Sequence, residues 1–271
     1  MFRLTVECRA EERDGLVAEL SDAGTEGIVE HDLFEGGCRL EAFFEDMATA
    51  AAVAGRISAS NVTVEACEDR DWVAYSQAQW EPELVGERFF LVPSWRNDPT
   101  PAGRLRLVMP PGSAPGTGFH PATQLALEAL ERRVRPGRRV FDLGTGSGIL
   151  ALGAILMGAN SVIACDIETA AVEAAASYLR EAGVPVSLFA GSARSVRSGA
   201  VDLLVANLNA AAIRQLAGEM ARVLAPGGEA IVTGFERYEA ERVEHLFASF
   251  GFACHDRIES SGWVCLICGR S

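Results

Sequence analysis

Residues 139–150, RVFDLGTGSGIL, join a strand-like apolar run to a helix-like apolar run through three glycines at alternate positions. Such a turn brings the backbone close to a ligand and directs the free N–H groups at the start of the helix toward it. A strand that passes directly into a helix is also the first half of a βαβ unit, and βαβ units build parallel sheets. This segment therefore predicts a parallel sheet with a small-molecule site at the end of one strand.

The rest of the chain beyond residue 104 alternates strand-like and helix-like runs in the same way. Its strands after residue 139 are almost continuously apolar, which is typical of parallel strands covered by helices on both faces. The sequence predicts a doubly wound, mainly parallel α/β sheet, with an antiparallel edge formed by its last two strands. The expected strands are 104–110, 138–143, 161–167, 185–191, 201–208, 229–235 and 262–269.

The first 66 residues have shorter elements in the order strand, helix, strand, strand, helix, strand, with a turn at Gly36 and Gly37. This βαββαβ order predicts a ferredoxin-like α+β domain at 1–66. A connector rich in tryptophan and charge follows at 67–95, with a short helix expected at 71–79, and the larger domain occupies 96–271.

The charge is unevenly distributed between these regions. The whole chain has a formal net charge of −13, and residues 1–70 contribute −10 of it, with 16 acidic residues against 6 arginines. This surplus disfavours nucleic acid and anionic membranes as partners and favours a basic one. A solvated acidic surface that only keeps the protein in solution is the alternative explanation.

The seven cysteines and the N-terminal sequence indicate the compartment. The cysteines are scattered through apolar runs, so we expect buried free thiols in a reducing environment. Cys265 and Cys268 are three positions apart in a strand-like run and would face opposite sides of it, and no histidine cluster accompanies them, so no metal site is expected. Neither a signal peptide nor a membrane span is recognisable, and we expect a cytoplasmic protein.

The spacing of the glycines indicates the ligand. A dinucleotide-binding turn reads G-x-G-x-x-G and would need a glycine at 149, where this chain has Ile149. Its own pattern is D-x-G-x-G-x-G, with Asp142 two residues ahead of Gly144 and with Gly146 following. A carboxylate in that place repels a pyrophosphate but accepts hydrogen bonds from a cationic amino group, so the sequence favours S-adenosylmethionine.

A second acidic residue supports a nucleoside ligand. Asp166 ends the next strand-like run, 22 residues after Gly144, and ribose-binding acids stand about 20 residues beyond the first glycine. A carboxylate there can accept hydrogen bonds from both ribose hydroxyls. The alternative is that Asp166 only caps the helix that begins near Glu168.

Several collinear segments resemble the PrmA family, the methyltransferases of ribosomal protein L11. The first is PGTGFHPATQLALEAL at 115–130, which is close to the family pattern F-G-T-G-x-H-x-T-T. The connector WEPELVGERFFLVPSW, the loop and helix DLGTGSGILALGAILMGA, the strand end VANLNA and the segment LAPGGEAIVTGF resemble the family in the same order. The resemblance covers most of the chain.

This resemblance implies a small substrate-recognition domain in front of a class I methyltransferase domain with a Rossmann-like seven-stranded sheet. It implies methyl transfer from S-adenosylmethionine, leaving S-adenosylhomocysteine, to lysine side-chain and α-amino nitrogens of ribosomal protein L11. The cofactor contacts that it implies are Thr123, Gly144, Asp166 and Asn207, with Thr117 and Gly118 in a loop over the methionine end. The chain departs from the pattern at Pro115, at Ala122 and at Ser192, which stands where many methyltransferases have an acid for the adenine amino group.

The acceptor chemistry follows from two further residues. Asn207 ends a strand in Asn-Leu-Asn-Ala, without the prolines and tyrosine with which N-P-P-Y-type enzymes hold a planar amide or base, so an alkyl amine is the expected acceptor. Asn207 could orient that amine, and His120 could pass its proton on through water. His120 precedes Pro121 at a helix start, and it could equally be a helix cap.

Three other functions remain open from the sequence. A methyltransferase of the same architecture could act on lysines of another protein or on a small amine. A non-catalytic binding module could keep the cofactor fold and use its acidic domain to dock a basic partner. An oxidoreductase is weaker than either, because Ile149 breaks the dinucleotide pattern.

Overall fold

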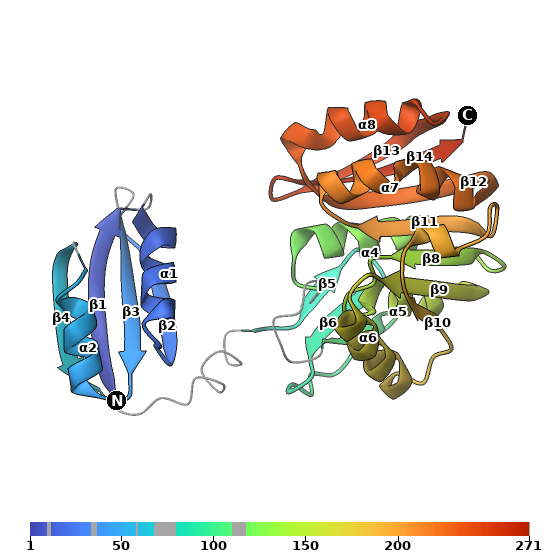
Figure 1. Ribbon diagram of the computed structural model, residues 1–271. Coiled ribbons are helices and arrows are strands. Elements are labelled where there is room, and N and C mark those ends of the chain that lie inside the picture. Colours follow the sequence, from blue (N-terminus) through green and yellow to red (C-terminus); the bar gives the residue numbers. More distant parts are fainter. Residues whose placement is uncertain (10–11, 34–36, 58, 68–79, 110–117, 271) are drawn as a thin grey trace. The chain divides into compact units, whose positions relative to one another are not determined.

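The computed structural model describes residues 1–9, 12–33, 37–57, 59–67, 80–109 and 118–270. The chain divides into two compact units, Met1–Trp80 and Glu81–Ser271 (Figure 1). Three features expected from the sequence lie outside the described residues: the helix at 71–79, the turn residue Gly36, and Thr117 in the glycine-rich loop before residue 118.

The first unit has the ferredoxin-like arrangement that its element order predicts. Its four strands lie in the order β2-β3-β1-β4 with every neighbouring pair antiparallel. One face of the sheet packs in a core with apolar side chains from both helices. The elements are β1 (Phe2–Arg9), α1 (Arg13–Asp22), β2 (Gly27–Asp32), β3 (Gly37–Phe44), α2 (Met47–Ala54) and β4 (Ser60–Ala66).

The second unit is built on a seven-stranded sheet in the order β10-β9-β8-β11-β12-β14-β13. The first five strands in this order are parallel, while β14 is antiparallel to both of its neighbours. The strands are β8 (Arg139–Leu143), β9 (Ser161–Asp166), β10 (Ser187–Ala190), β11 (Val201–Asn207), β12 (Leu224–Glu236), β13 (Phe252–Ser260) and β14 (Trp263–Arg270). The mainly parallel α/β sheet with an antiparallel edge is confirmed.

Two strands correct the sequence prediction. The expected strand at 104–110 forms β7 (Leu105–Met109), which belongs to a separate three-stranded sheet and not to the seven-stranded one. Residues 252–260, FACHDRIES, were not expected to form a strand, but they form β13 at the edge of the sheet. Most of its side chains are exposed or only partly buried, because an edge strand is covered less than a central one. The predicted final strand, β14, therefore lies between β12 and β13 instead of forming the edge itself.

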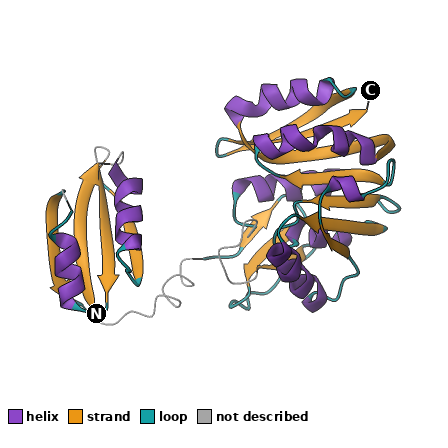
Figure 2. Ribbon diagram, viewed as in Figure 1, coloured by secondary structure: helices purple, strands orange, loops and turns teal. Residues whose placement is uncertain are grey.

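Helices cover both faces of this sheet (Figure 2). Apolar residues of α4 (Pro121–Arg133), α5 (Ile149–Leu156) and α6 (Thr169–Glu181) share one buried cluster, and those of α7 (Ala210–Val223) and α8 (Ala240–Ala248) share another. Successive residues of one strand enter opposite clusters: Leu203 and Val205 the first, Leu204 and Ala206 the second. The near-continuous apolar runs exist because both faces of each strand are buried.

A small second sheet connects the start of this unit to α4. It consists of β5 (Glu83–Val85), β6 (Phe89–Pro93) and β7 (Leu105–Met109), with β6 parallel to β7 and antiparallel to β5. The carboxylate of Glu131 on α4 accepts the backbone N–H groups of Glu87 and Arg88 at 3.0–3.1 Å. These hydrogen bonds join the turn between β5 and β6 to α4.

The cysteines also depart from the sequence prediction. We expected seven free thiols, but Cys8 is bonded to Cys38, and Cys254 to Cys268. Each pair lies directly opposite on neighbouring antiparallel strands, a relation that sequence separations of 30 and 14 do not reveal. The other three cysteines, Cys67, Cys165 and Cys265, are free. Cys265 and Cys268 belong to opposite faces of the sheet, as their spacing predicts.

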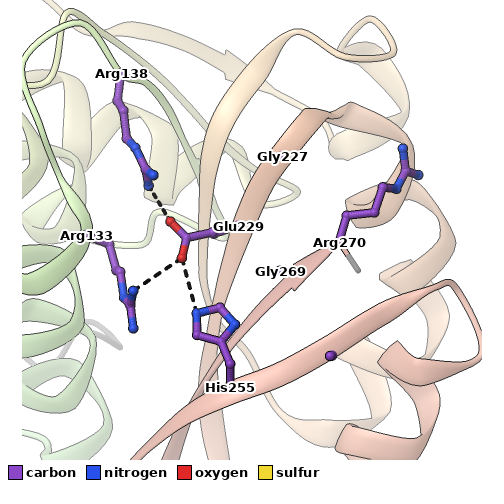
Figure 3. Close-up of a pocket in the computed structure, with 8 residues that line it drawn as sticks. Arg133, Arg138, Gly227, Glu229, His255, Gly269 and Arg270 are labelled. Atoms are coloured by element: carbon purple, nitrogen blue, oxygen red, sulfur yellow. Dashed lines mark hydrogen bonds and ion pairs between the residues drawn. The ribbon is translucent and has the colours of Figure 1, made fainter.

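The amino ends of the parallel strands carry a cavity of about 500 Å³ (Figure 3). Its lining comes from the end of α4, the residue before β8, the start of β12, and the paired strands β13 and β14. The lining residues are Arg133, Arg138, Gly227, Glu229, Ala253, His255, Gly269 and Arg270. This cavity lies at the opposite edge of the sheet from the glycine turn, which follows the carboxyl end of β8.

Candidate functional site

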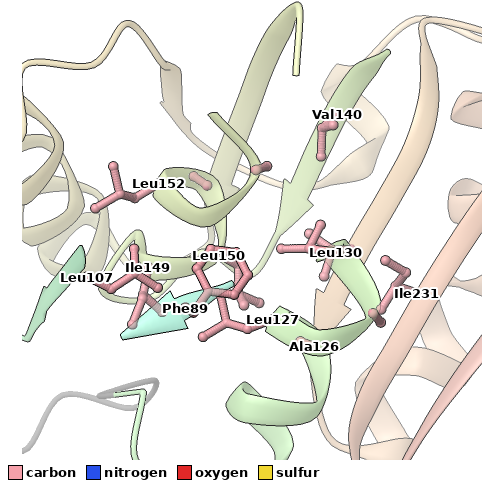
Figure 4. Close-up of a cluster of buried hydrophobic side chains, with 14 of the residues drawn as sticks. Phe89, Leu107, Ala126, Leu127, Leu130, Val140, Ile149, Leu150, Leu152 and Ile231 are labelled. Carbon is pink, nitrogen blue, oxygen red and sulfur yellow. The ribbon is translucent and has the colours of Figure 1, made fainter. Parts of the chain in front are cut away.

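The glycine turn rests on a core in which α4 and α5 pack closely together (Figure 4). A Cβ on Gly153 of α5 would lie 2.8 Å from Cδ2 of Leu127 on α4, so glycine is what lets the two helices approach. Phe89 of the small sheet is fully buried in the same cluster. The same packed core thus supports the turn before α5 and the N-terminus of α4.

The backbone of the turn explains its glycines. Gly144, Gly146 and Gly148 all have positive φ, at 77°, 51° and 87°, a region that side chains disfavour. The N–H groups of Gly144 and Thr145 both donate to the carbonyl of Cys165 at the end of β9, at 2.9 Å. These two amides are therefore used within the protein and are not available to a ligand.

Asp142 is buried beneath this turn. Its Oδ2 accepts the hydroxyl of Thr145 at 2.7 Å and the N–H of Ala151 at 3.1 Å, so the carboxylate ties the turn to α5. Its Oδ1 is buried and has no hydrogen-bond partner among the described residues. Burial raises the pKa of Asp142 to about 7, because the charged form is poorly solvated there. A nearby cation would stabilise the ionised form.

Asp166 ends β9 beside the turn. Its Oδ2 accepts the N–H of Gly146 at 3.0 Å, and its Oδ1 accepts the N–H of Glu168, just before α6, at 3.1 Å. The second contact is the helix-start interaction that the sequence left open as an alternative. A carboxylate has about four lone-pair positions, so two backbone donors leave room for further hydrogen bonds.

Two residues near Asp166 are candidates for contact with a nucleoside. Ile167 is 79% exposed, a large apolar side chain directly after the acid, and the sequence reasoning did not single it out. The signal that could have found it is an isoleucine placed just past a strand end, before the polar start of α6. Ser192 follows β10, where its side chain caps the 3-10 helix Ala193–Ser195 by accepting the N–H of Arg194 at 3.4 Å.

Asn207 and Thr123 are brought together from sequence positions 84 apart. Asn207 ends β11, and its Nδ2 donates to Oγ1 of Thr123 in the first turn of α4 at 3.0 Å. Thr123 is buried, being only 1% exposed. The hydrogen bond fixes the amide so that its Oδ1, which has no partner among the described residues, is the end available to another donor.

Gly234 on β12 is a site residue that the sequence reasoning missed. A Cβ there would lie 2.6 Å from the carbonyl oxygen of Leu208 and 2.8 Å from Oδ1 of Asn207. Gly234 has φ +95°. Without a side chain at this position, β12 can lie close against the residues that follow β11. Its signal in the sequence is a glycine inside an otherwise apolar strand, which often marks a close backbone approach.

His120 and Gly118 flank the start of α4. The Nδ1 of His120 accepts the N–H of Ala122 at 3.2 Å, so His120 is the N-cap of this helix, and its exposed ring meets Trp263 edge-on with centroids 4.4 Å apart. Gly118 is buried with φ +88°, and a Cβ there would lie 2.6 Å from the side chain of Met109. Thr117, from the same predicted loop, lies outside the described residues.

These residues share one edge of the sheet. The turn after β8, Asp166 after β9, Ser192 after β10 and Asn207 at the end of β11 all lie at carboxyl ends of parallel strands. β9 and β11 lie on either side of β8, so the connections diverge there, and open α/β sheets bind ligands at such a switch point. Among the described residues no three His, Cys, Asp or Glu side chains are grouped to hold a metal ion.

Comparison with known proteins identifies the family of this chain. Residues 2–271 match the family model described as ribosomal protein L11 methyltransferase (PrmA). The chain belongs to this family. It is 39% identical over 220 residues to the ribosomal protein L11 methyltransferase of Burkholderia lata, covering 81% of this chain and 72% of that protein. The relative in Dechloromonas aromatica is 38% identical, with 81% and 73% covered.

A solved PrmA-family structure is similar as well. The crystal structure of a ribosomal protein L11 methylase from Lactobacillus delbrueckii subsp. bulgaricus superposes with a TM-score of 0.65 and 28% identity. It covers 71% of this chain and 98% of that one. The chain is therefore a methyltransferase with a class I methyltransferase fold, and its methyl donor is S-adenosylmethionine. No helix in its described parts is long and apolar enough to cross a membrane.

Proposed function

We propose that this chain transfers methyl groups from S-adenosylmethionine to lysine side-chain or α-amino nitrogens of ribosomal protein L11. The observation that carries the proposal is the convergence of Asp142, Asp166 and the Thr123–Asn207 pair at the switch point of the sheet. Asp142 and Asp166 suit two parts of the donor, the Thr123–Asn207 pair suits the acceptor amine, and β9 and β11, which end in Asp166 and Asn207, flank β8 and its glycine turn.

The residues present fit S-adenosylmethionine. The unpartnered Oδ1 of Asp142 suits the ammonium of the methionine part, reached directly or through one ordered water. Asp166 has lone pairs left for the ribose hydroxyls, while exposed Ile167 offers an apolar surface to the adenine. Ser192 stands two residues after Ala190, the register partner of Asp166, so it would be placed to contact the adenine of a nucleoside held by Asp166.

The three glycines and the start of α4 complete the proposed cofactor site. Gly144 and Gly146 take the positive φ that the turn needs, a Cβ on Gly144 would lie 2.5 Å from Cδ2 of Leu208, and Gly118, also with positive φ, stands just before α4. Thr123 would act through Asn207, and Thr117 is proposed to lie over the methionine end. When bound, S-adenosylmethionine supplies a methyl group on a sulfonium, which is already a reactive donor.

The chain's own part in the reaction is to position a neutral amine. Methyl transfer to nitrogen is an in-line displacement, so alignment contributes much of the rate. The Oδ1 of Asn207 can accept a hydrogen bond from the amine and hold its lone pair toward the methyl group. His120 is exposed and next to Trp263, so it can take the released proton through water to solvent, beside its role as helix cap.

We propose that residues 1–66 recognise the substrate, that 67–95 connect the two domains, and that 96–271 form the methyltransferase domain. In the first unit most arginines are already occupied: Arg39 with Glu7 at 2.8 Å, Arg9 with Glu12 at 3.0 Å and Arg3 with Glu41 at 3.6 Å. The remaining acidic surplus of residues 1–70 would attract a basic ribosomal protein and repel nucleic acid and anionic membranes. We place this reaction in the cytoplasm.

The proposal is tested by incubating the full chain with ribosomal protein L11 and methyl-labelled S-adenosylmethionine, followed by mass spectrometry of L11. The chain contains no lysine, so lysine labelling cannot come from the enzyme itself. We expect methylated lysines or a methylated N-terminus on L11. Labelling of other proteins, with L11 unmodified, would contradict the proposed substrate. Deleting residues 1–66 should abolish L11 methylation while S-adenosylmethionine still binds.

A further inference from the structure

The cavity at the amino ends of the strands is a second concentration of charge, separate from the methyltransferase site. Its lining contains three arginines and a histidine but a single carboxylate, Glu229, in a chain whose net charge is −13. Arg138 donates to Oε2 of Glu229 at 2.6 Å, and Arg133 and His255 approach Oε1 at 3.5 and 3.3 Å. Figure 3 shows these three side chains converging on Glu229.

One carboxylate cannot satisfy this many donors. Arg133 also donates to Asp256 at 2.9 Å, yet its Nε is buried and has no partner among the described residues. Arg270 has no carboxylate partner in the part of the chain that the structure describes, and its guanidinium lies over the ring of Phe252 at 5.5 Å. Guanidinium N–H groups therefore remain for an added acceptor on both sides of the cavity.

Two glycines keep the space open. A Cβ on Gly269 would lie 3.2 Å from Cε1 of His255 and 3.7 Å from Cγ of Glu229, so a side chain there would enter the charged cluster. Gly227 has φ +74° and nothing within 4 Å of its Cβ position, so it borders open space. The cavity volume of about 500 Å³ accommodates a small organic anion.

We propose that this cavity binds a phosphate group, either as free phosphate or as part of a small phosphate monoester. Planar guanidinium groups pair with phosphate oxygens through two parallel hydrogen bonds, and the three arginines of the lining outnumber Glu229 and Asp256, the two carboxylates that they contact. Because the cavity and the glycine turn lie at opposite edges of the sheet, this anion does not occupy the methyl-donor site.

The proposal is tested by calorimetric titration of the full-length protein at fixed ionic strength in chloride. The probes are inorganic phosphate and glycerol phosphate, and we expect saturable binding in the millimolar range or tighter. Arg270→Gln removes a guanidinium without leaving a carboxylate unpaired, so folding should be unaffected and the affinity should fall about tenfold. Arg138→Gln should weaken binding similarly. The matched control is Arg242→Gln, an exposed arginine on α8 outside the cavity lining, which should leave the affinity unchanged.

Each outcome bears on the proposal. Tighter binding of glycerol phosphate than of phosphate identifies the monoester as the ligand type, and equal binding identifies the free ion. If neither probe saturates, or if Arg242→Gln weakens binding as much as Arg270→Gln does, the cavity is not a phosphate site.

Discussion

Asn207 at the end of β11 donates a hydrogen bond of 3.0 Å to the hydroxyl of Thr123, which is buried in the first turn of α4. The bond joins a strand of the sheet to the helix that precedes the glycine turn in sequence. It fixes the orientation of the Asn207 amide and leaves its oxygen to accept from another group. Thr123 can thus control the geometry of the residue that we propose to hold the acceptor amine.

Thr123→Val should lower kcat/KM about tenfold, because the valine keeps the shape and removes the hydroxyl that orients Asn207. Asn207→Ala should lower kcat/KM about a hundredfold, as expected for loss of a positioned amide. The double variant should be no worse than Asn207→Ala alone, since the threonine then has nothing to orient. Steady-state kinetics of the three variants measure this coupling. Additive losses would mean that Thr123 contributes independently of Asn207.

The buried carboxylate of Asp142 should make stability depend on pH. Its pKa is raised from 3.8 to about 7, so the folded state favours the protonated form. This contribution is complete below pH 3.8 and is lost as the pH rises through about 7. From pH 5 to pH 8 the free energy of unfolding of the unliganded protein should fall by about 3 kcal/mol from this group.

Urea unfolding of the wild type and of Asp142→Asn at both pH values checks this. The amide does not titrate, so the free energy of unfolding of the variant should not show the decrease of about 3 kcal/mol between pH 5 and pH 8 that comes from Asp142. The surface carboxylates of Asp98 and Asp202, whose pKa values are lowered by arginine hydrogen bonds, lose their contribution only at more acidic pH. Equal pH dependence in both proteins would show that Asp142 stays ionised across this range.

Gly234→Ala should lower the free energy of unfolding by more than the cost of placing alanine at a positive φ. Placing alanine at positive φ costs about 1–2 kcal/mol, and crowding against Leu208 adds about 1–3 kcal/mol. Gly137 is the matched control, because its φ of +93° is close to the +95° of Gly234 but nothing lies within 4 Å of its Cβ position. Thermal unfolding should give the larger loss for Gly234→Ala, which alone should also reduce methyl transfer. Equal losses would exclude the crowding.

Ser192→Asp should tighten S-adenosylmethionine binding about fivefold, because a carboxylate can accept a hydrogen bond from the adenine amino group. Aspartate is also a good cap, so it can replace the serine contact to the N–H of Arg194. Calorimetry measures the change, and Ser192→Ala should bind nearly as the wild type does. Weaker binding by the aspartate variant would place the adenine amino group elsewhere.

The sequence was sufficient where local pattern determines structure. The glycine turn, the acid that ends β9 and the alternation of buried strands with helices each depend on neighbours in the chain, and each lies where it was expected. The Thr123–Asn207 hydrogen bond depends on strand order, and the disulfides depend on register, so spacing could not reveal them. The sequence did not predict β13, because an edge strand with exposed side chains lacks a continuous apolar run.

The position of β14 between β12 and β13 constrains how this sheet can assemble. In the described structure β13 pairs only with β14, which follows it in sequence, so β13 cannot join the sheet on its own. The two strands are connected at Ser261 and Gly262, both with positive φ, and they can form a hairpin before docking. A chain interrupted before Trp263 would present the bare edge of β12, with its buried residues Ile231 and Val232, to other molecules. The docked β13–β14 hairpin thus covers the edge of β12 and protects the chain from aggregation through that edge.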